Sequence, residues 1–141
     1  MTFELPVSAA FVLLADQLTK RFVAGRRIQG SPAPVRGCVP IRYSLNPLGG
    51  GEFRRNQTAL LLVWGFALVT LILFAQQGYY FRHAAAQAGL GLGLGGASSN
   101  LYDWLRHKAV IDFVKIGWWP AFNLADIGIC AGAIAALVFM R

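Results

Sequence analysis

The sequence has few charged residues, and acids are the scarcest of them. Only 13% of its 141 residues are charged, and Asp and Glu together number 6 against 13 Lys and Arg. Hydrophobic residues, in contrast, make up 56% of the chain. This composition excludes an ordinary water-soluble domain, and it predicts a protein that resides in lipid.

Cysteine and histidine are also scarce. The two cysteines, Cys38 and Cys130, have no second thiol or histidine at ligand spacing, so neither a disulfide nor a metal site is indicated. The net charge of +7 does not indicate nucleic acid, because Lys and Arg cluster in loops beside apolar runs, where anionic lipid headgroups attract them. We therefore expect membrane lipids, and no nucleic acid, as partners.

Four apolar segments are long enough to cross a bilayer. No charged residue occurs between Arg55 and Arg82 or between Arg82 and Asp103, and about 20 apolar residues suffice for a span. Two further apolar segments carry one acid each. The sequence thus predicts an all-α membrane protein, a single integral membrane domain over residues 1–141. Its four transmembrane helices are expected at approximately residues 5–23, 58–76, 84–104 and 120–140.

The segments between these helices predict a little additional structure. The first loop is rich in proline and glycine, and its alternating stretch Val39–Leu45 predicts a strand. We therefore expect a small extramembrane, β-containing loop region. In the third and fourth helices, small residues at four-residue spacing, such as Gly128 and Gly132, predict close backbone contact. At the end of the first helix, we expect the stems of Lys20 and Arg21 to extend to the interface.

The acids are the most informative residues, because an aspartate at mid-membrane costs about 2.5–3.5 kcal/mol on insertion scales. Asp16 and Asp103 lie within or at the ends of predicted spans. Asp126 is expected about one and a half turns inside the fourth helix, on the same face as Asn123. Asp112 lies in the loop that joins the third and fourth helices. The carboxylates of Asp112 and Asp126 can therefore meet at one membrane interface.

A pair of carboxylates held close together can perform acid–base chemistry. They share a proton, so one can activate water while the other protonates the amide that is cleaved. This is the chemistry of aspartic proteases, and the proton belongs to the pair, so separate acid and base roles are not assigned. Acids within a membrane also serve proton relay and ion binding. A proton- or ion-conducting bundle is therefore an alternative.

Four segments, in order along the chain, resemble the blocks that define lipoprotein signal peptidases, also called signal peptidase II. A single block of this kind is a modest signal, but the ordered set, spread over most of the chain, is a strong one. The segments are Asp16–Lys20, Leu45–Phe53 around Asn46, Gly95–Asp103 with Val110–Phe113, and Phe122–Asp126.

The resemblance implies an aspartic endopeptidase that removes the signal peptide from diacylglyceryl-modified prolipoproteins and needs no metal or organic cofactor. Asp112 and Asp126 would be the catalytic pair. The protein would be a multi-pass, monomeric protein of the bacterial inner (cytoplasmic) membrane, with its active site on the outer face. The residues expected to bind the substrate or frame its cleft are Asp16, Asn46, Asn100 and Asn123.

Some features depart from the family's pattern. Trp104 stands where the family usually has arginine, Lys108 stands where it has glycine, and the segment around Asn46 is longer than usual. These departures motivate another alternative, a diverged paralogue that binds lipidated or helical peptides without cleaving them.

The distribution of basic residues conflicts with the membrane orientation that the resemblance implies. All of them except Arg82 and Arg141 fall in segments that the family's topology places outside, whereas the positive-inside rule predicts the reverse. We take the order of the motifs as the guide.

Overall fold

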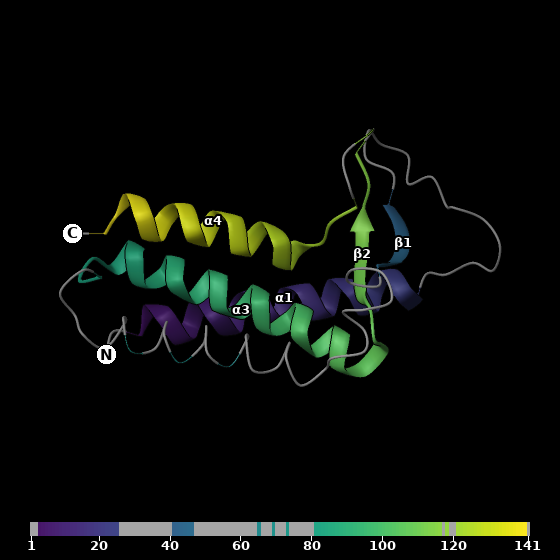
Figure 1. Ribbon diagram of the computed structural model, residues 1–141, viewed down its shortest axis with the longest axis horizontal. Helices are drawn as coiled ribbons and strands as arrows, with labels where there is room; N and C mark the ends of the chain where they lie inside the picture. The colour runs from purple at the N-terminus through teal and green to yellow at the C-terminus, as the bar shows by residue number, and fades with distance from the viewer. Residues whose placement is uncertain are drawn as a thin grey trace.

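Three helices and a two-stranded sheet make up the part of the chain that the computed structural model describes (Figure 1). The described residues are 3–25, 41–46 by their backbone, 65, 69, 73, 81–116, 118 and 121–140. The predicted second helix, residues 58–76, lies outside them except for Gly65, Val69 and Leu73, which are helical.

The helices α1 (Glu4–Gly25), α3 (Ala84–His107) and α4 (Leu124–Val138) run side by side along the long axis of the molecule (Figure 1). Helix α3 packs against both α1 and α4. The two chain ends lie at one end of this bundle, and the sheet lies at the other. Each of the three helices therefore has one end near the sheet, and these three ends can contribute to one site.

Glycine allows α3 to approach both neighbours closely. A Cβ on Gly132 of α4 would lie 2.5 Å from the carbonyl oxygen of Gly89 in α3, and a Cβ on Gly95 would collide with the backbone of Ala9 in α1. Real side chains do not tolerate such contacts, so the helices pack backbone to backbone at these points. The predicted close contact between the third and fourth helices is confirmed.

The sheet consists of β1 (Ile41–Asn46) and β2 (Val110–Val114), paired antiparallel. Ser44 pairs with Asp112 and Asn46 pairs with Val110. The predicted strand in the first loop is confirmed by β1. Strand β2 falls where the sequence predicted a loop, because its first four residues are all buried and show no alternation of polar and apolar side chains.

The outer face of α1 is apolar and exposed. Among the described helices, none combines the length and the hydropathy expected of a membrane span, so the four spans stay a prediction. The exposed apolar side chains nevertheless recur every three or four residues along α1. They are Val7, Phe11, Leu14, Leu18 and Phe22, preceded by Phe3 just before the helix.

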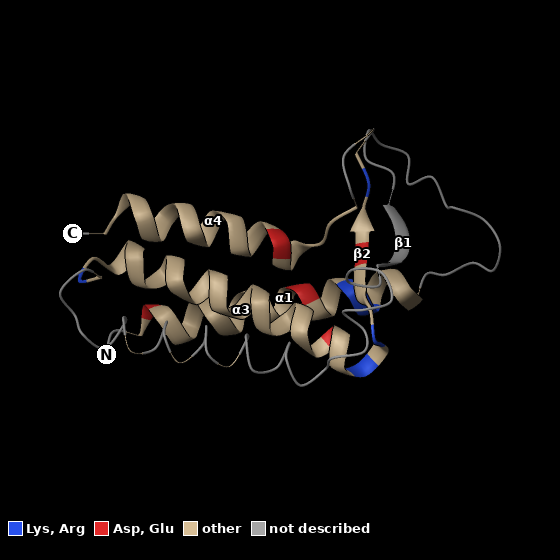
Figure 2. Cartoon of the chain, in the orientation of Figure 1, with Lys and Arg blue, Asp and Glu red and all other residues tan. Residues whose placement is uncertain are grey.

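Charged side chains gather at the end of the bundle that carries the sheet, where α1 and α3 approach β2 (Figure 2). Acids from four different elements meet there: Asp16 of α1, Asp103 of α3, Asp112 of β2 and Asp126 of α4. The rest of the bundle is nearly free of charge in the described part of the chain.

Candidate active site

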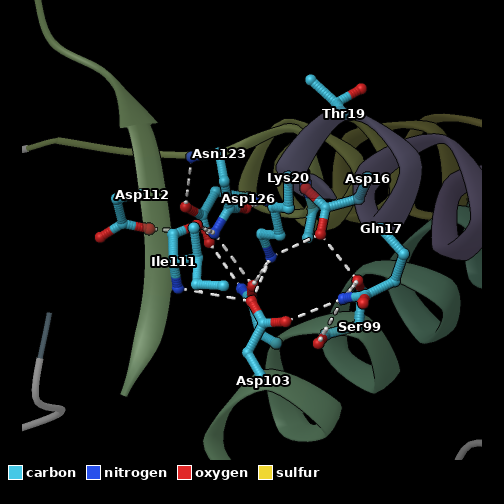
Figure 3. A network of polar contacts seen from close by, with 12 residues as sticks. Asp16, Gln17, Thr19, Lys20, Ser99, Asp103, Ile111, Asp112, Asn123 and Asp126 are labelled. Atoms are coloured by element: carbon cyan, nitrogen blue, oxygen red, sulfur yellow. Dashed lines mark hydrogen bonds and ion pairs between the residues drawn. The ribbon is translucent and has the colours of Figure 1, made fainter. Parts of the chain in front are cut away.

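Asp112 and Asp126 are joined through a single residue, Asn123 (Figure 3). The side-chain Nδ2 of Asn123 donates to Oδ1 of Asp112 at 2.9 Å, and the backbone N–H of Asn123 donates to Oδ2 of Asp126 at 3.0 Å. Asp112 is buried, with 3% of its surface exposed, and Asp126 is half-buried. The structure therefore brings together the two acids that the sequence paired.

The start of α4 explains how Asp126 is positioned. Asn123 is the N-cap, and its Oδ1 accepts from the backbone N–H of Asp126 while Asp126 accepts from the backbone of Asn123. This reciprocal capping box satisfies two N–H groups that a helix start leaves unpaired. The helix therefore begins at Leu124, and the prediction that Asp126 lies one and a half turns inside it is wrong. Asp126 is in the first turn, beside the sheet.

Asn100 of α3 contacts Asp126 from the other side. Its Nδ2 donates to Oδ1 of Asp126 at 2.9 Å, and its Oδ1 accepts from Nδ2 of Asn123 at 3.0 Å. Both oxygens of Asp126 are thus hydrogen-bonded, one by Asn100 and one by Asn123. These contacts fix the orientation of the carboxylate.

A buried ion cluster lies behind this pair. Lys20 is 2% exposed, and its Nζ lies 2.5 Å from Oδ2 of Asp16 and 2.6 Å from Oδ2 of Asp103. The expectation that Lys20 extends to the membrane interface is therefore wrong. A buried charge is stable only when it is paired and hydrogen-bonded, and two carboxylates supply those partners here.

The two acids of the cluster connect the elements of the bundle. Asp16 accepts from the hydroxyl of Ser99 at 2.7 Å and from the backbone N–H of Ala125, in the first turn of α4, at 2.9 Å. Asp103 accepts from Nε2 of Gln17 at 2.8 Å and from the backbone N–H of Ile111 in β2 at 3.4 Å. The cluster therefore holds α1, α3, α4 and β2 in register around the acids.

The residues predicted to frame a substrate cleft occupy different places. Asn100 and Asn123 contact the acid pair directly. Asp16 is 0% exposed, and its oxygens are hydrogen-bonded within the ion cluster. The backbone of Asn46 lies at the end of β1, opposite Val110, on the strand next to Asp112.

The sequence interpretation missed the ion cluster, although a signal for it exists. Asp16 and Lys20 are four residues apart, which places them on one face of a helix. Ser99 directly precedes Asn100 in the sequence, but this position in the sequence does not indicate a role for it. Only the packing of α1 against α3 shows that these groups meet.

Two further features complete the surroundings of the site. Trp104, at the position where the resemblance suggests arginine, is 2% exposed, and the Nζ of Lys108 lies 5.3 Å from its ring centre. Lys108 ends α3 with a positive φ of 57°, the conformation that glycine adopts most easily. Among the described residues, no three His, Cys, Asp or Glu side chains converge as metal ligands.

A helical bundle with paired acids at one end is the framework of a membrane aspartic peptidase. The chain belongs to the signal peptidase II family, whose model matches residues 8–141. The predicted resemblance is thereby confirmed, together with the assignment as a membrane aspartic peptidase that removes signal peptides from prolipoproteins.

Individual relatives agree over nearly the whole chain. The chain is 37% identical to the lipoprotein signal peptidase of Rhodococcus jostii over 94% of its own length and 69% of that enzyme. It is 41% identical to that of Pelotomaculum thermopropionicum over 88% of its own length and 82% of that enzyme.

A solved structure shares the fold. It is that of a bacterial membrane enzyme determined by the in meso method at 1.9 Å resolution, with a TM-score of 0.78 and 24% sequence identity. The match covers 94% of this chain and 88% of that chain.

Proposed function

We propose that Asp112 and Asp126 are the catalytic dyad of this peptidase, and that they cleave the signal peptide from diacylglyceryl-modified prolipoproteins. The observation that carries the proposal is the bridge through Asn123, which donates to both carboxylates at 2.9 and 3.0 Å. One residue thus holds two carboxylates that come from separate elements, β2 and α4.

The proposed reaction uses the pair as a unit. One carboxylate accepts a proton from water as the water oxygen attacks the amide carbon. The other carboxyl group donates a proton to the amide nitrogen as the carbon–nitrogen bond breaks. The two acids exchange these protonation states in each cycle, so the roles belong to the pair.

The other predicted site residues have different proposed roles. Asn100 and Asn123 orient the dyad, since both donate to its carboxylates. Asp16, being fully buried, stabilises the site rather than contacting the substrate. Asn46, at the end of the strand that pairs with β2, frames the substrate cleft beside Asp112.

We also propose a location for the enzyme. The protein spans the bacterial inner membrane with four helices, and the exposed apolar face of α1 contacts lipid acyl chains. The active site then lies at the outer face, where the ends of α1 and α3 meet the sheet. We propose that the enzyme acts as a monomer.

The test is cleavage of a purified diacylglyceryl-modified precursor in detergent by the wild type and by Asp112→Asn and Asp126→Asn. Each variant should lose about 10²- to 10⁴-fold in kcat, the range of general acid–base catalysis. Glu4→Gln, the same chemical change at the opposite end of α1, should cleave at the wild-type rate. Undiminished cleavage by either aspartate variant would contradict the dyad.

A further inference from the structure

Lys20 is a buried cation whose hydrogen-bonding capacity is fully used. Its Nζ lies 2.5 Å from Asp16, 2.6 Å from Asp103 and 3.1 Å from Oδ1 of Asn100. An ammonium group has three N–H donors and no acceptor, so these three oxygens account for all of its donors. The first two partners neutralise the charge, but the third is a neutral amide that contacts Asp126.

Asn123, in contrast, has too few donors for its surroundings. Its Nδ2 has two hydrogens, yet it lies within hydrogen-bond distance of three acceptors. These are Oδ1 of Asp112 at 2.9 Å, Oδ1 of Asn100 at 3.0 Å and the carbonyl oxygen of Ile111 at 3.3 Å. The two shortest of these contacts, to Asp112 and Asn100, use both hydrogens of the Asn123 amide, so Asn123 links the two residues.

We propose that Lys20 is a positioning residue of the peptidase and acts on the dyad through Asn100. By donating to Oδ1 of Asn100, Lys20 fixes the orientation of that amide and directs its Nδ2 at Asp126. Asn123 also donates to the same oxygen, so the two donors together hold the amide of Asn100 in this orientation. This inference rests on the proposed function of Asp112 and Asp126 as the dyad.

The charge of Lys20 makes this orientation one-sided. A cation with no acceptor attracts the oxygen of an amide and repels its NH₂ group. Without Lys20, only Asn123 among the described residues donates to the oxygen of Asn100, and the amide is directed less firmly at Asp126. Since Lys20 is 2% exposed, its loss should change the dyad and leave substrate binding intact.

The first experiment replaces Lys20 in the full-length enzyme by methionine, which has a similar length and no charge. We expect Lys20→Met to lower kcat by about 10²-fold, the size of effect that small misplacements of catalytic groups produce, with KM unchanged. The matched control is Thr19→Val. Within the part of the chain that the structure describes, the hydroxyl of Thr19 donates only to the carbonyl oxygen of Ala15 in α1, and its side chain points away from the cluster in Figure 3.

The second experiment distinguishes the positioning role of Lys20 from its role in neutralising two buried acids. Lys20→Met leaves two buried acids without their cation, which lowers stability and can prevent folding. In the double variant Lys20→Met/Asp103→Asn, one negative charge is removed along with the positive one. We expect thermal stability to recover relative to Lys20→Met while kcat stays low, since Asn100 still lacks its donor.

Recovery of wild-type kcat in the double variant would overturn the inference, and so would a raised KM with normal kcat in Lys20→Met. If Lys20→Met cannot be purified in folded form, the double variant decides alone. The dyad itself is judged separately. Cleavage by Asp126→Asn would refute the proposed function, whereas an inactive Asp126→Asn beside a fully active double variant would refute only the role of Lys20.

Discussion

At the scale of single residues, Asn123 combines two tasks that can be separated by substitution. Its Oδ1 caps α4 by accepting from the backbone of Asp126, and its Nδ2 donates to Asp112. The first task fixes the start of a helix, and the second holds a carboxylate. Serine can perform the first because its hydroxyl oxygen also caps helices well, but it has no NH₂ group with which to perform the second.

We therefore predict that Asn123→Ser keeps the cap of α4 and loses activity. A hydrogen bond to a charged group contributes about 1.5–3 kcal/mol, which corresponds to roughly 10- to 100-fold in kcat. Asn123→Ala should lose about 1 kcal/mol of stability in addition, because the cap is lost too. Kinetics and thermal denaturation in detergent measure the two effects. Equal stability of the two variants would mean that the cap is unimportant.

The sequence predicted the centre of the site better than its surroundings. Asp112, Asp126, Asn100 and Asn123 could be named because acids are scarce in this chain and because the ordered segments resemble a known family. Lys20 could not, since a long basic side chain at a predicted helix end is usually assumed to extend to the interface. One of its two acidic partners, Asp103, lies far away in the sequence, and only tertiary packing brings the two together.

At the scale of elements, α3 is built to fit between two neighbours. Its glycines face both α1 and α4, whereas no atom of the described residues lies within 4 Å of the position that a Cβ on Gly93 would occupy. Gly93 and Gly95 are thus two glycines in the same helix with opposite surroundings. Alanine at Gly95 reports the cost of closer packing, and alanine at Gly93 reports only the general effect of replacing glycine in a helix.

We predict opposite results for alanine at these two positions. Gly95→Ala should lower stability by about 1–3 kcal/mol, the usual cost of overpacking, because the added methyl group meets the backbone of Ala9. Gly93→Ala should raise stability by up to about 1 kcal/mol, the difference in helix propensity. Thermal unfolding in one detergent compares them. If Gly95→Ala is as stable as Gly93→Ala, then α1 and α3 do not pack as described.

Element boundaries were predictable only where local chemistry marks them. The strand β1 follows from its alternating pattern, and the glycine spacing predicts the contact of α3 with α4. The start of α4 was placed too early because Asn123 was assigned to the helix face rather than to its cap. Strand β2 was missed because burial on both faces removes the alternation on which such a prediction depends.

At the scale of the whole molecule, the charged and polar residues of the site are concentrated at one end of the bundle. The dyad, the ion cluster and the sheet lie at one end, and both chain ends lie at the other (Figures 1 and 2). If the bundle spans the membrane as proposed, the basic residues near the site face outward, against the positive-inside rule. Burial offers a partial reason, because Lys20 is neutralised by two acids and contributes little to the charge that the membrane encounters.

The orientation can be tested by labelling single cysteines in spheroplasts with a membrane-impermeant maleimide. In a Cys38→Ser/Cys130→Ser background, His107→Cys reports on the site end and Arg82→Cys on the opposite end, since both positions are exposed. We expect His107→Cys to react before lysis and Arg82→Cys only after it. The cysteine-free background controls for unspecific labelling, and cleavage activity of each variant verifies its fold. The reverse pattern would place the dyad in the cytoplasm, where the positive-inside rule would then hold and the proposed outer-face location would be wrong.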